Sequence, residues 1–181
     1  MAAKNLFFAG KMLSQDADSQ VTNAVLESAV KDGALVVLGN LAADTTYRAT
    51  GDVEYDVYEA AAPAAATDEV AIVDYAGISG GDINGNYYKM GVKLFGLEAP
   101  AGEIVRVRRL HLHDKFWLGE ANFDGAVTVG EYAKAKASSM LHEPAASLPA
   151  SGYAIKIQKE QDLTTGMKSE GKMYLCEVVQ L

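Results

Sequence analysis

Ser79 stands in the pattern G-x-S-x-G, which in hydrolases places a nucleophilic serine on a sharp turn between a strand and a helix. A candidate strand, residues 69–75, precedes the motif, and Gly77, Gly80 and Gly81 surround the serine. The segment that follows, 82–86, is rich in turn-forming residues and leads toward another strand. Without a helix, Ser79 would lack the backbone amides of an oxyanion hole, so we expect no hydrolase.

Asp82, Asn84 and Asn86 have the spacing of the first oxygen ligands in a calcium-binding EF-hand loop. Such a loop also needs a glycine at its sixth position and a bidentate acid at its twelfth, where this chain has Tyr87 and Lys93. These departures exclude an EF-hand. A plain hairpin loop is the expected structure, and a weak cation site is the alternative.

His111 and His113 lie two apart on a predicted strand and would project to one side. They could bind zinc only if Asp114 or His142 joined them, and no third ligand stands at a diagnostic spacing. Nothing singles out a catalytic pair among the 24 carboxylates. We therefore expect a protein that is not an enzyme and that needs no metal and no cofactor.

The charge of the chain is unevenly distributed. The net charge is −8, with five Lys and Arg against 13 Asp and Glu in residues 1–90 and eleven of each in residues 91–181. An acidic chain without clustered basic residues is a poor general nucleic-acid binder. No apolar run approaches the roughly 20 residues of a membrane-spanning helix. Neither nucleic acid nor membrane is an expected partner, and the single Cys176 rules out an intramolecular disulfide.

One helix is predicted over residues 17–31, because small and apolar residues repeat there at three- and four-residue spacing. It is preceded by an arm, residues 1–13, with an apolar cluster of Leu6, Phe7 and Phe8. We expect this arm to be a docking element outside the core, because chain ends are mobile unless something holds them. Residues 1–33 are thus predicted to form an N-terminal arm and helix.

From residue 34 onward the apolar residues alternate with polar ones, which is typical of half-buried antiparallel strands. Turn-forming pairs separate the strands. The strands are predicted around residues 34–38, 53–57, 70–72, 88–94, 104–112, 153–157 and 173–181. The predicted fold class is mainly β: an antiparallel sandwich or small barrel over residues 34–181, with the N-terminal arm and one short α-helix.

The predicted strand at 104–112 changes phase partway, since Val105 and Val107 have one parity and Leu110 and Leu112 the other. One extra residue, a β-bulge, would restore the alternation. The bulge would place the basic residues on one face of an otherwise acidic protein. That basic face would comprise Arg106, Arg108 or Arg109, His111 and His113.

Phe116, Trp117 and Phe123 form a cluster of large aromatic residues, which dominate either a core or an interface. Adjacent Phe116 and Trp117 should face opposite sides of a strand, so only one of them can be central in the core.

Two segments carry a resemblance to capsid decoration, or cement, proteins of tailed bacteriophages: GEIVRVRRL at 102–110 and DKFWLGEANF at 114–123. The resemblance implies a β-rich virion protein, assembled in the bacterial cytoplasm, that binds the outside of the major capsid protein and bridges neighbours. A homo-oligomer is expected.

The alternative function is a ligand- or carbohydrate-binding β module whose stacking residues are Tyr55, Tyr58, Tyr87, Tyr88 and Trp117. The expected partner-binding residues are Leu6, Phe7, Phe8, Arg106, Arg108, Arg109 and Trp117.

Overall fold

The computed structural model describes residues 4–13, 20–42, 57–75, 96–165 and 168–181. Over these residues the protein is mainly β, as the sequence predicts, with a six-stranded sheet, a closed five-stranded barrel and a two-stranded sheet. The elements in chain order are β1 (Phe7–Lys11), β2 (Val21–Leu26), β3 (Val30–Lys31), β4 (Leu35–Leu41), β5 (Val57–Ala61), β6 (Ala71–Val73), β7 (Glu98–Ala99), β8 (Ile104–Arg109), β9 (Lys115–Gly119), the short 3-10 helix η5 (Glu120–Asn122), β10 (Tyr132–Ala135), β11 (His142–Ala145), β12 (Ala154–Thr165) and β13 (Lys168–Gln180).

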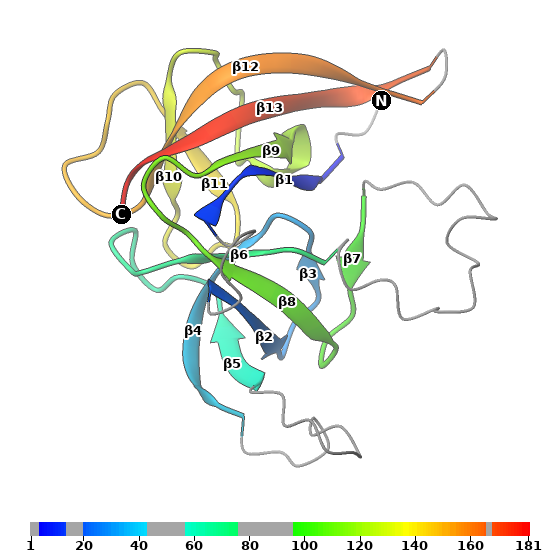
Figure 1. Ribbon diagram of the computed structural model, residues 1–181, viewed down its shortest axis with the longest axis vertical. Coiled ribbons are helices and arrows are strands. Elements are labelled where there is room, and N and C mark those ends of the chain that lie inside the picture. Colours follow the sequence, from blue (N-terminus) through cyan, green and yellow to red (C-terminus); the bar gives the residue numbers. More distant parts are fainter. Residues whose placement is uncertain (1–3, 14–19, 43–56, 76–95, 166–167) are drawn as a thin grey trace.

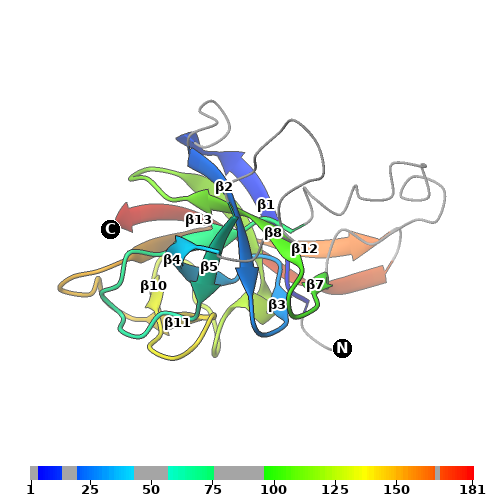
Figure 2. The same cartoon turned by 90° about the horizontal axis from the view of Figure 1, so that it is seen from below.

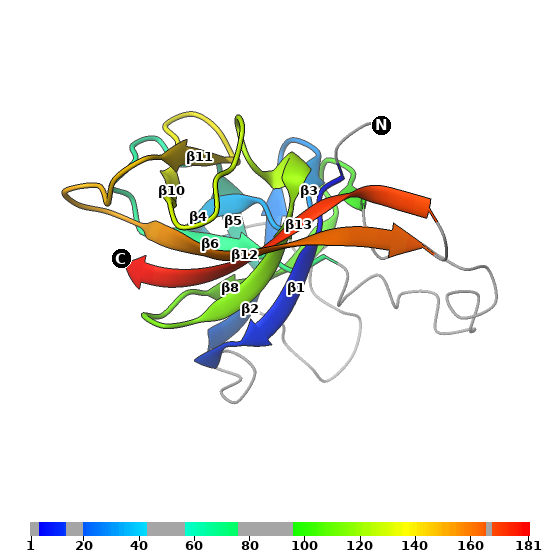
Figure 3. The same cartoon turned by 90° about the horizontal axis from the view of Figure 1, so that it is seen from above.

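The six-stranded sheet and the barrel form two layers. The sheet has the strand order β1-β9-β13-β12-β10-β11 and lies in the upper half of Figure 1, while the barrel, β2-β5-β4-β6-β8, lies in the lower half. Figure 2 views the molecule from the barrel side. Figure 3 views it from the sheet side, where the long β12–β13 hairpin crosses in front. One face of the six-stranded sheet therefore points away from the barrel.

Two apolar cores stabilise the fold, one between the two layers and one inside the barrel. In the first, Phe116 and Tyr174 of the sheet pack in one cluster with Leu35 and Ile72 of the barrel wall. The second fills the barrel itself and includes Val36 of the same strand β4. Because the first part of β4 is buried on both faces, its sequence begins as a continuous apolar run without alternation.

The alternating patterns of the C-terminal half are confirmed. Ile155 and Ile157 of β12 and Cys176 of β13 point into the first core, and their polar neighbours point outward. The strands at 34–38 and 70–72 are present as β4 and β6. The strand expected over residues 88–94 lies outside the described residues, as does most of the one expected over 53–57, whose last residue opens β5.

The predicted helix is wrong over its described residues, 20–31. Val21–Leu26 forms β2, which pairs in parallel with β5 and antiparallel with β8. Ala24, Val25 and Leu26 are all buried, so both faces of this strand are covered and a period of two never develops. The spacing of small apolar residues then resembles a helical stripe by coincidence.

The predicted N-terminal arm is also wrong over its described residues, 4–13. Phe7–Lys11 forms β1, which pairs antiparallel with β9 at the edge of the six-stranded sheet. Leu6 and Phe7 are buried, so they belong to the core and are not docking residues. The segment 1–33 thus contributes strands to both layers.

The predicted β-bulge near Arg108 is absent. Strand β8 pairs with β2 and with β6 in uniform register and ends at Arg109. The change of phase after Val107 marks the end of the strand, because Leu112 and His113 form a turn toward β9 and His113 has a φ of 71°.

Candidate protein-binding surface

The outer face of the six-stranded sheet carries an apolar row across three strands. Phe8 of β1 lies opposite Trp117 of β9, and Trp117 lies opposite Leu175 of β13. Directly opposed residues of antiparallel strands share a face. Since Phe7 and Phe116 point into the core, this row points away from it. We call Phe8, Trp117 and Leu175 the apolar row.

The apolar row is accessible, because Phe8 is 60% exposed while Phe7 beside it is only 3% exposed. Trp117 and Leu175 are half-buried. A large exposed aromatic ring next to a half-buried tryptophan is typical of interfaces, where such side chains supply contact area. Of the apolar cluster expected at the N-terminus, only Phe8 is available to a partner.

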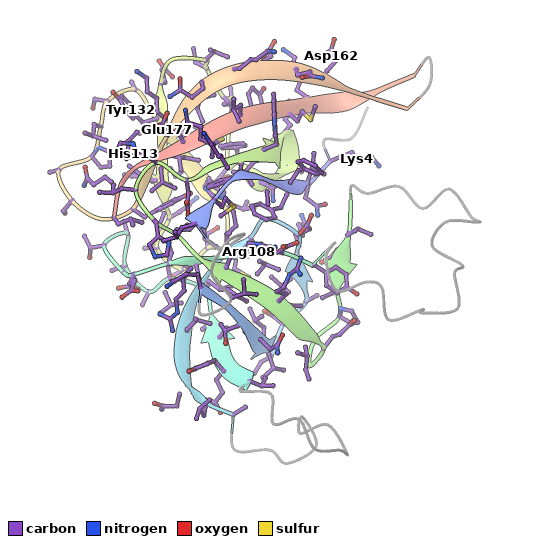
Figure 4. The ribbon with its side chains drawn as sticks, in the orientation of Figure 1. Lys4, Arg108, His113, Tyr132, Asp162 and Glu177 are labelled. Carbon is purple, nitrogen blue, oxygen red and sulfur yellow. The ribbon has the colours of Figure 1, made fainter. Side chains whose placement is uncertain are left out.

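A polar row runs beside the apolar row on the same face. Glu177 of β13 lies opposite Lys115 of β9 and Lys156 of β12, and Lys156 lies opposite Tyr132 of β10. Figure 4 places Tyr132, Glu177 and His113 at the same end of the sheet, with Asp162 toward the hairpin tip. The row therefore crosses four neighbouring strands.

Glu177 is the one carboxylate at the centre of this polar row. His113 Nδ1 lies 3.2 Å from its Oε1, Lys115 Nζ lies 3.4 Å from its Oε2, and Gln158 Nε2 donates a hydrogen bond of 2.9 Å to Oε2. The hydrogen bond to His113 and the charge of Lys115 hold the pKa of Glu177 below its usual value, although partial burial opposes them. Glu177 stays ionised and is already neutralised within the chain.

The outer face is basic in an acidic protein. By register, and among the side chains that the structure describes, it carries five lysines, namely Lys11, Lys115, Lys134, Lys156 and Lys159, against the two acids Glu143 and Glu177. Lys134 pairs with Glu143 at 3.2 Å. A partner suited to this face has an acidic surface with an apolar centre.

The arginines do not form the basic face that the sequence predicts. Arg106 Nη2 and Arg108 Nε each lie 2.6 Å from Asp74 Oδ2, and Asp74 and Arg108 are buried. Figure 4 places Arg108 near the middle of the molecule. Arg109 has the opposite parity and lines a hollow of the barrel. Because strand β8 alternates without a bulge, its arginines divide between two faces.

The free edge of β1 is partly blocked, which favours docking through a sheet face over strand addition. Phe7 N–H donates a hydrogen bond of 2.8 Å to Asp32 Oδ2, so this edge amide is already satisfied. At the other edge of the sheet, β11 contains Pro144, which has no amide hydrogen to donate.

The structure describes only some of the other candidate residues. Ser79 and the segment with Asp82, Asn84 and Asn86 lie outside the described residues. His111 lies next to Asp114, with 3.9 Å between Nδ1 and Oδ2. Among the residues that the structure describes, no three potential ligands are grouped to hold a metal.

The carbohydrate alternative expected from the sequence has a divided set of aromatic residues. Tyr55, Tyr87 and Tyr88 lie outside the described residues, Tyr58 is on the barrel strand β5, and Trp117 is on the six-stranded sheet. These residues do not share one stacking platform in the described part of the chain.

His142 is inside the core, apart from the exposed His113. Its Nε2 lies 3.3 Å from the carbonyl oxygen of Gly33, and the Tyr153 hydroxyl lies 3.3 Å from its Nδ1. A carbonyl only accepts, so Nε2 carries the proton and Nδ1 accepts from Tyr153. Burial lowers the pKa of His142 to about 4, which keeps the ring neutral at physiological pH.

Because His142 is buried in its neutral form, we expect the free energy of unfolding to fall in acid. The unfolded chain binds the proton near pH 6.5 and the folded chain near pH 4, so the free energy of unfolding should fall across that window by about 3 kcal/mol. Urea titrations at pH 7 and pH 4 measure the difference. The difference between the two pH values should be clearly smaller in His142→Gln than in the wild type. An equal pH dependence in both proteins would contradict the conclusion that His142 is neutral in the folded chain.

Sequence comparisons identify no relatives. No protein-family model matches the chain, and a search of curated proteins finds no match. Within the described part of the chain, no helix is long and apolar enough to cross a membrane.

Proposed function

We propose that this chain is a structural protein of a tailed-bacteriophage head, a decoration or cement protein that binds the outside of the major capsid subunits and bridges neighbours. The observation that carries the proposal is the apolar row, Phe8–Trp117–Leu175, with lysines along one side and at one end of it on the outer face of the six-stranded sheet. Such a surface suits a protein partner.

The resemblance to decoration proteins supports the same surface. Its two segments, 102–110 and 114–123, contain β8, β9 and η5. Strand β9 supplies Trp117 and Lys115 to the outer face. The part of the sequence that resembles the family therefore includes the strand at the centre of the apolar row.

The energetics of a cement protein require only modest contacts. Full burial of an exposed large apolar side chain is worth roughly 1.5–3 kcal/mol before ordering costs, and the half-buried Trp117 and Leu175 would contribute less than this. Repetition over a shell lattice converts such contacts into strong overall attachment through multivalency. In this proposal the protein is located on the virion surface, is assembled in the bacterial cytoplasm and contacts further copies of itself.

The proposal can be tested by cosedimentation. Heads of the phage that encodes this chain are prepared without the protein, mixed with the purified chain and pelleted. The wild-type chain should cosediment, and Phe8→Asp and Trp117→Ser should weaken binding by at least about tenfold, because each removes an interface anchor. Binding should also weaken as salt is raised, since lysines lie beside the apolar row.

Leu41→Asp is the matched control. Leu41 is 55% exposed, close to the exposure of Phe8, but it lies on barrel strand β4. This variant should bind as the wild type does. Absence of the wild-type chain from the pelleted heads would reject the capsid assignment, and equal binding of all variants would reject the outer face as the docking surface.

A further inference from the structure

A hollow of about 250 Å³ opens at one end of the barrel. Strand β6 pairs with β4 only through Leu35 and Val36, so it leaves the barrel wall before β4 ends. Residues 37–39 of β4 continue past this point and line the hollow. The hollow exists because one of the five barrel strands is short.

The hollow is the mouth of the barrel, as the alternation of side chains shows. Val36, Ala60 and Val107 belong to the core inside the barrel or pack against it. Leu38 and Arg109 come two residues after Val36 and Val107, and Tyr58 comes two residues before Ala60. Residues two apart in a strand share a face, and all three of these line the hollow. Barrel mouths are common positions for ligand sites, because the closed sheet holds their walls in place.

The walls of the hollow combine apolar and polar groups. Leu38, Tyr58 and Val70 supply apolar surface and one aromatic ring, while Asp68, Glu69 and Arg109 supply charged groups. No hydrogen bond of the Tyr58 hydroxyl is found to any residue that the structure describes. An apolar side next to several donors and acceptors suits a ligand that is itself apolar on one face and polar at its rim.

Two of the polar groups are arranged to accept a ligand. Asp68 Oδ2 receives hydrogen bonds from the backbone N–H groups of Ala64 and Ala65, at 2.8 and 2.9 Å, which fix the direction of the carboxylate. Arg109 Nη1 lies 3.8 Å from Glu69 Oε1, and these side chains are 42% and 91% exposed. An exposed ion pair of this length is weak, so a ligand could separate it at little cost.

We propose that this barrel mouth binds one neutral sugar unit, with Tyr58 stacking on the ring and Asp68, Glu69 and Arg109 bonding to hydroxyl groups. Two carboxylates against one guanidinium disfavour phosphates and carboxylates as ligands. The volume lies below the roughly 300–1,000 Å³ of pockets for drug-sized molecules, which limits the occupant to one ring. The site does not depend on the capsid proposal, because none of its residues lies on the outer face of the six-stranded sheet.

Saturation-transfer difference NMR on the full chain tests this site with the methyl glycosides of glucose, galactose, mannose and N-acetylglucosamine. At least one glycoside should show saturation transfer and bind with a millimolar dissociation constant. Tyr58→Ala should weaken that binding by about tenfold or more through loss of the stacking surface. Arg109→Gln, a milder change at a half-exposed position, should weaken it as well.

Tyr132→Ala is the matched control, because Tyr132 is also a half-buried tyrosine but lies on the six-stranded sheet. Its glycoside binding should equal that of the wild type. No saturation transfer from any of the four glycosides would overturn the proposal, as would binding that both Tyr58→Ala and Arg109→Gln leave unchanged. Capsid binding by Tyr58→Ala should remain normal, which separates the two proposals.

Discussion

Phe7→Ala should lower the free energy of unfolding by about 3–5 kcal/mol, whereas Phe8→Ala should change it by less than about 1 kcal/mol. Phe7 is 3% exposed and its ring lies 5.7 Å from the ring of Phe116, centroid to centroid. Its removal leaves a cavity between the two layers. Phe8 is 60% exposed on the opposite face, so its removal leaves none.

Equilibrium unfolding in urea measures both variants against the wild type. A loss of several kcal/mol is a large part of the roughly 5–15 kcal/mol that stabilises a domain, so Phe7→Ala should show a much earlier midpoint. If both variants instead unfolded like the wild type, β1 would be a detachable arm. Binding to capsids should show the reverse order, with Phe8→Ala the weaker binder.

The contrast between these two neighbours shows what sequence reasoning could not resolve. An apolar triplet of Leu6, Phe7 and Phe8 contains no polar residue to reveal which side chain points inward. The answer depends on the register between β1 and β9, which are about a hundred residues apart in the chain. Register is set by contacts on both faces of the sheet, and local spacing does not encode it.

The mainly β class could be predicted because the sequence of a half-buried strand alternates between apolar and polar residues. In β12, Ile155 and Ile157 alternate with Lys156 since one face meets the core and the other faces away from it. The same rule fails for β2, where Ala24, Val25 and Leu26 are all buried. The small residues that fit inside a narrow barrel also have acceptable helix propensity, so a false helix was predicted there.

The candidate surface was predicted only in part, at Phe8 and Trp117. Leu175 and the lysines of β12 come from segments whose alternation was visible, but their position beside Trp117 follows from pairing with β13. The arginines were misassigned for the opposite reason. Their cluster in sequence is obvious, but Asp74, more than thirty residues earlier, pairs with two of them, with Arg108 in a buried ion pair and with Arg106 in a partly buried one.

Asn122 connects the start of β1, the end of β9 and the turn that follows β3. It is 1% exposed, and its Oδ1 accepts hydrogen bonds from Leu6 N–H at 2.8 Å and from Gly119 N–H at 3.2 Å. Its Nδ2 donates to the carbonyl oxygen of Asp32 at 2.7 Å. A side-chain amide is needed here because the site requires an acceptor and a donor on one planar group.

Asn122→Ala should therefore lower the free energy of unfolding by about 2–6 kcal/mol, because Leu6 N–H and the Asp32 carbonyl group lose their partner at about 1–3 kcal/mol each. Gly119 N–H keeps its hydrogen bond of 2.9 Å to the Leu6 carbonyl oxygen. Asn122→Asp keeps the acceptor but loses the donor, and it places a buried carboxylate near the Asp32 carbonyl oxygen. Its loss of stability should consequently be large at pH 7 and smaller near pH 5, where the carboxyl group is more easily protonated. Urea unfolding of both variants at the two pH values measures this, with the wild type at each pH as reference. A fall of less than about 1 kcal/mol in Asn122→Ala would mean that water replaces the amide, and that apolar packing and the hydrogen bond from Phe7 N–H to Asp32 are enough to hold β1 in place.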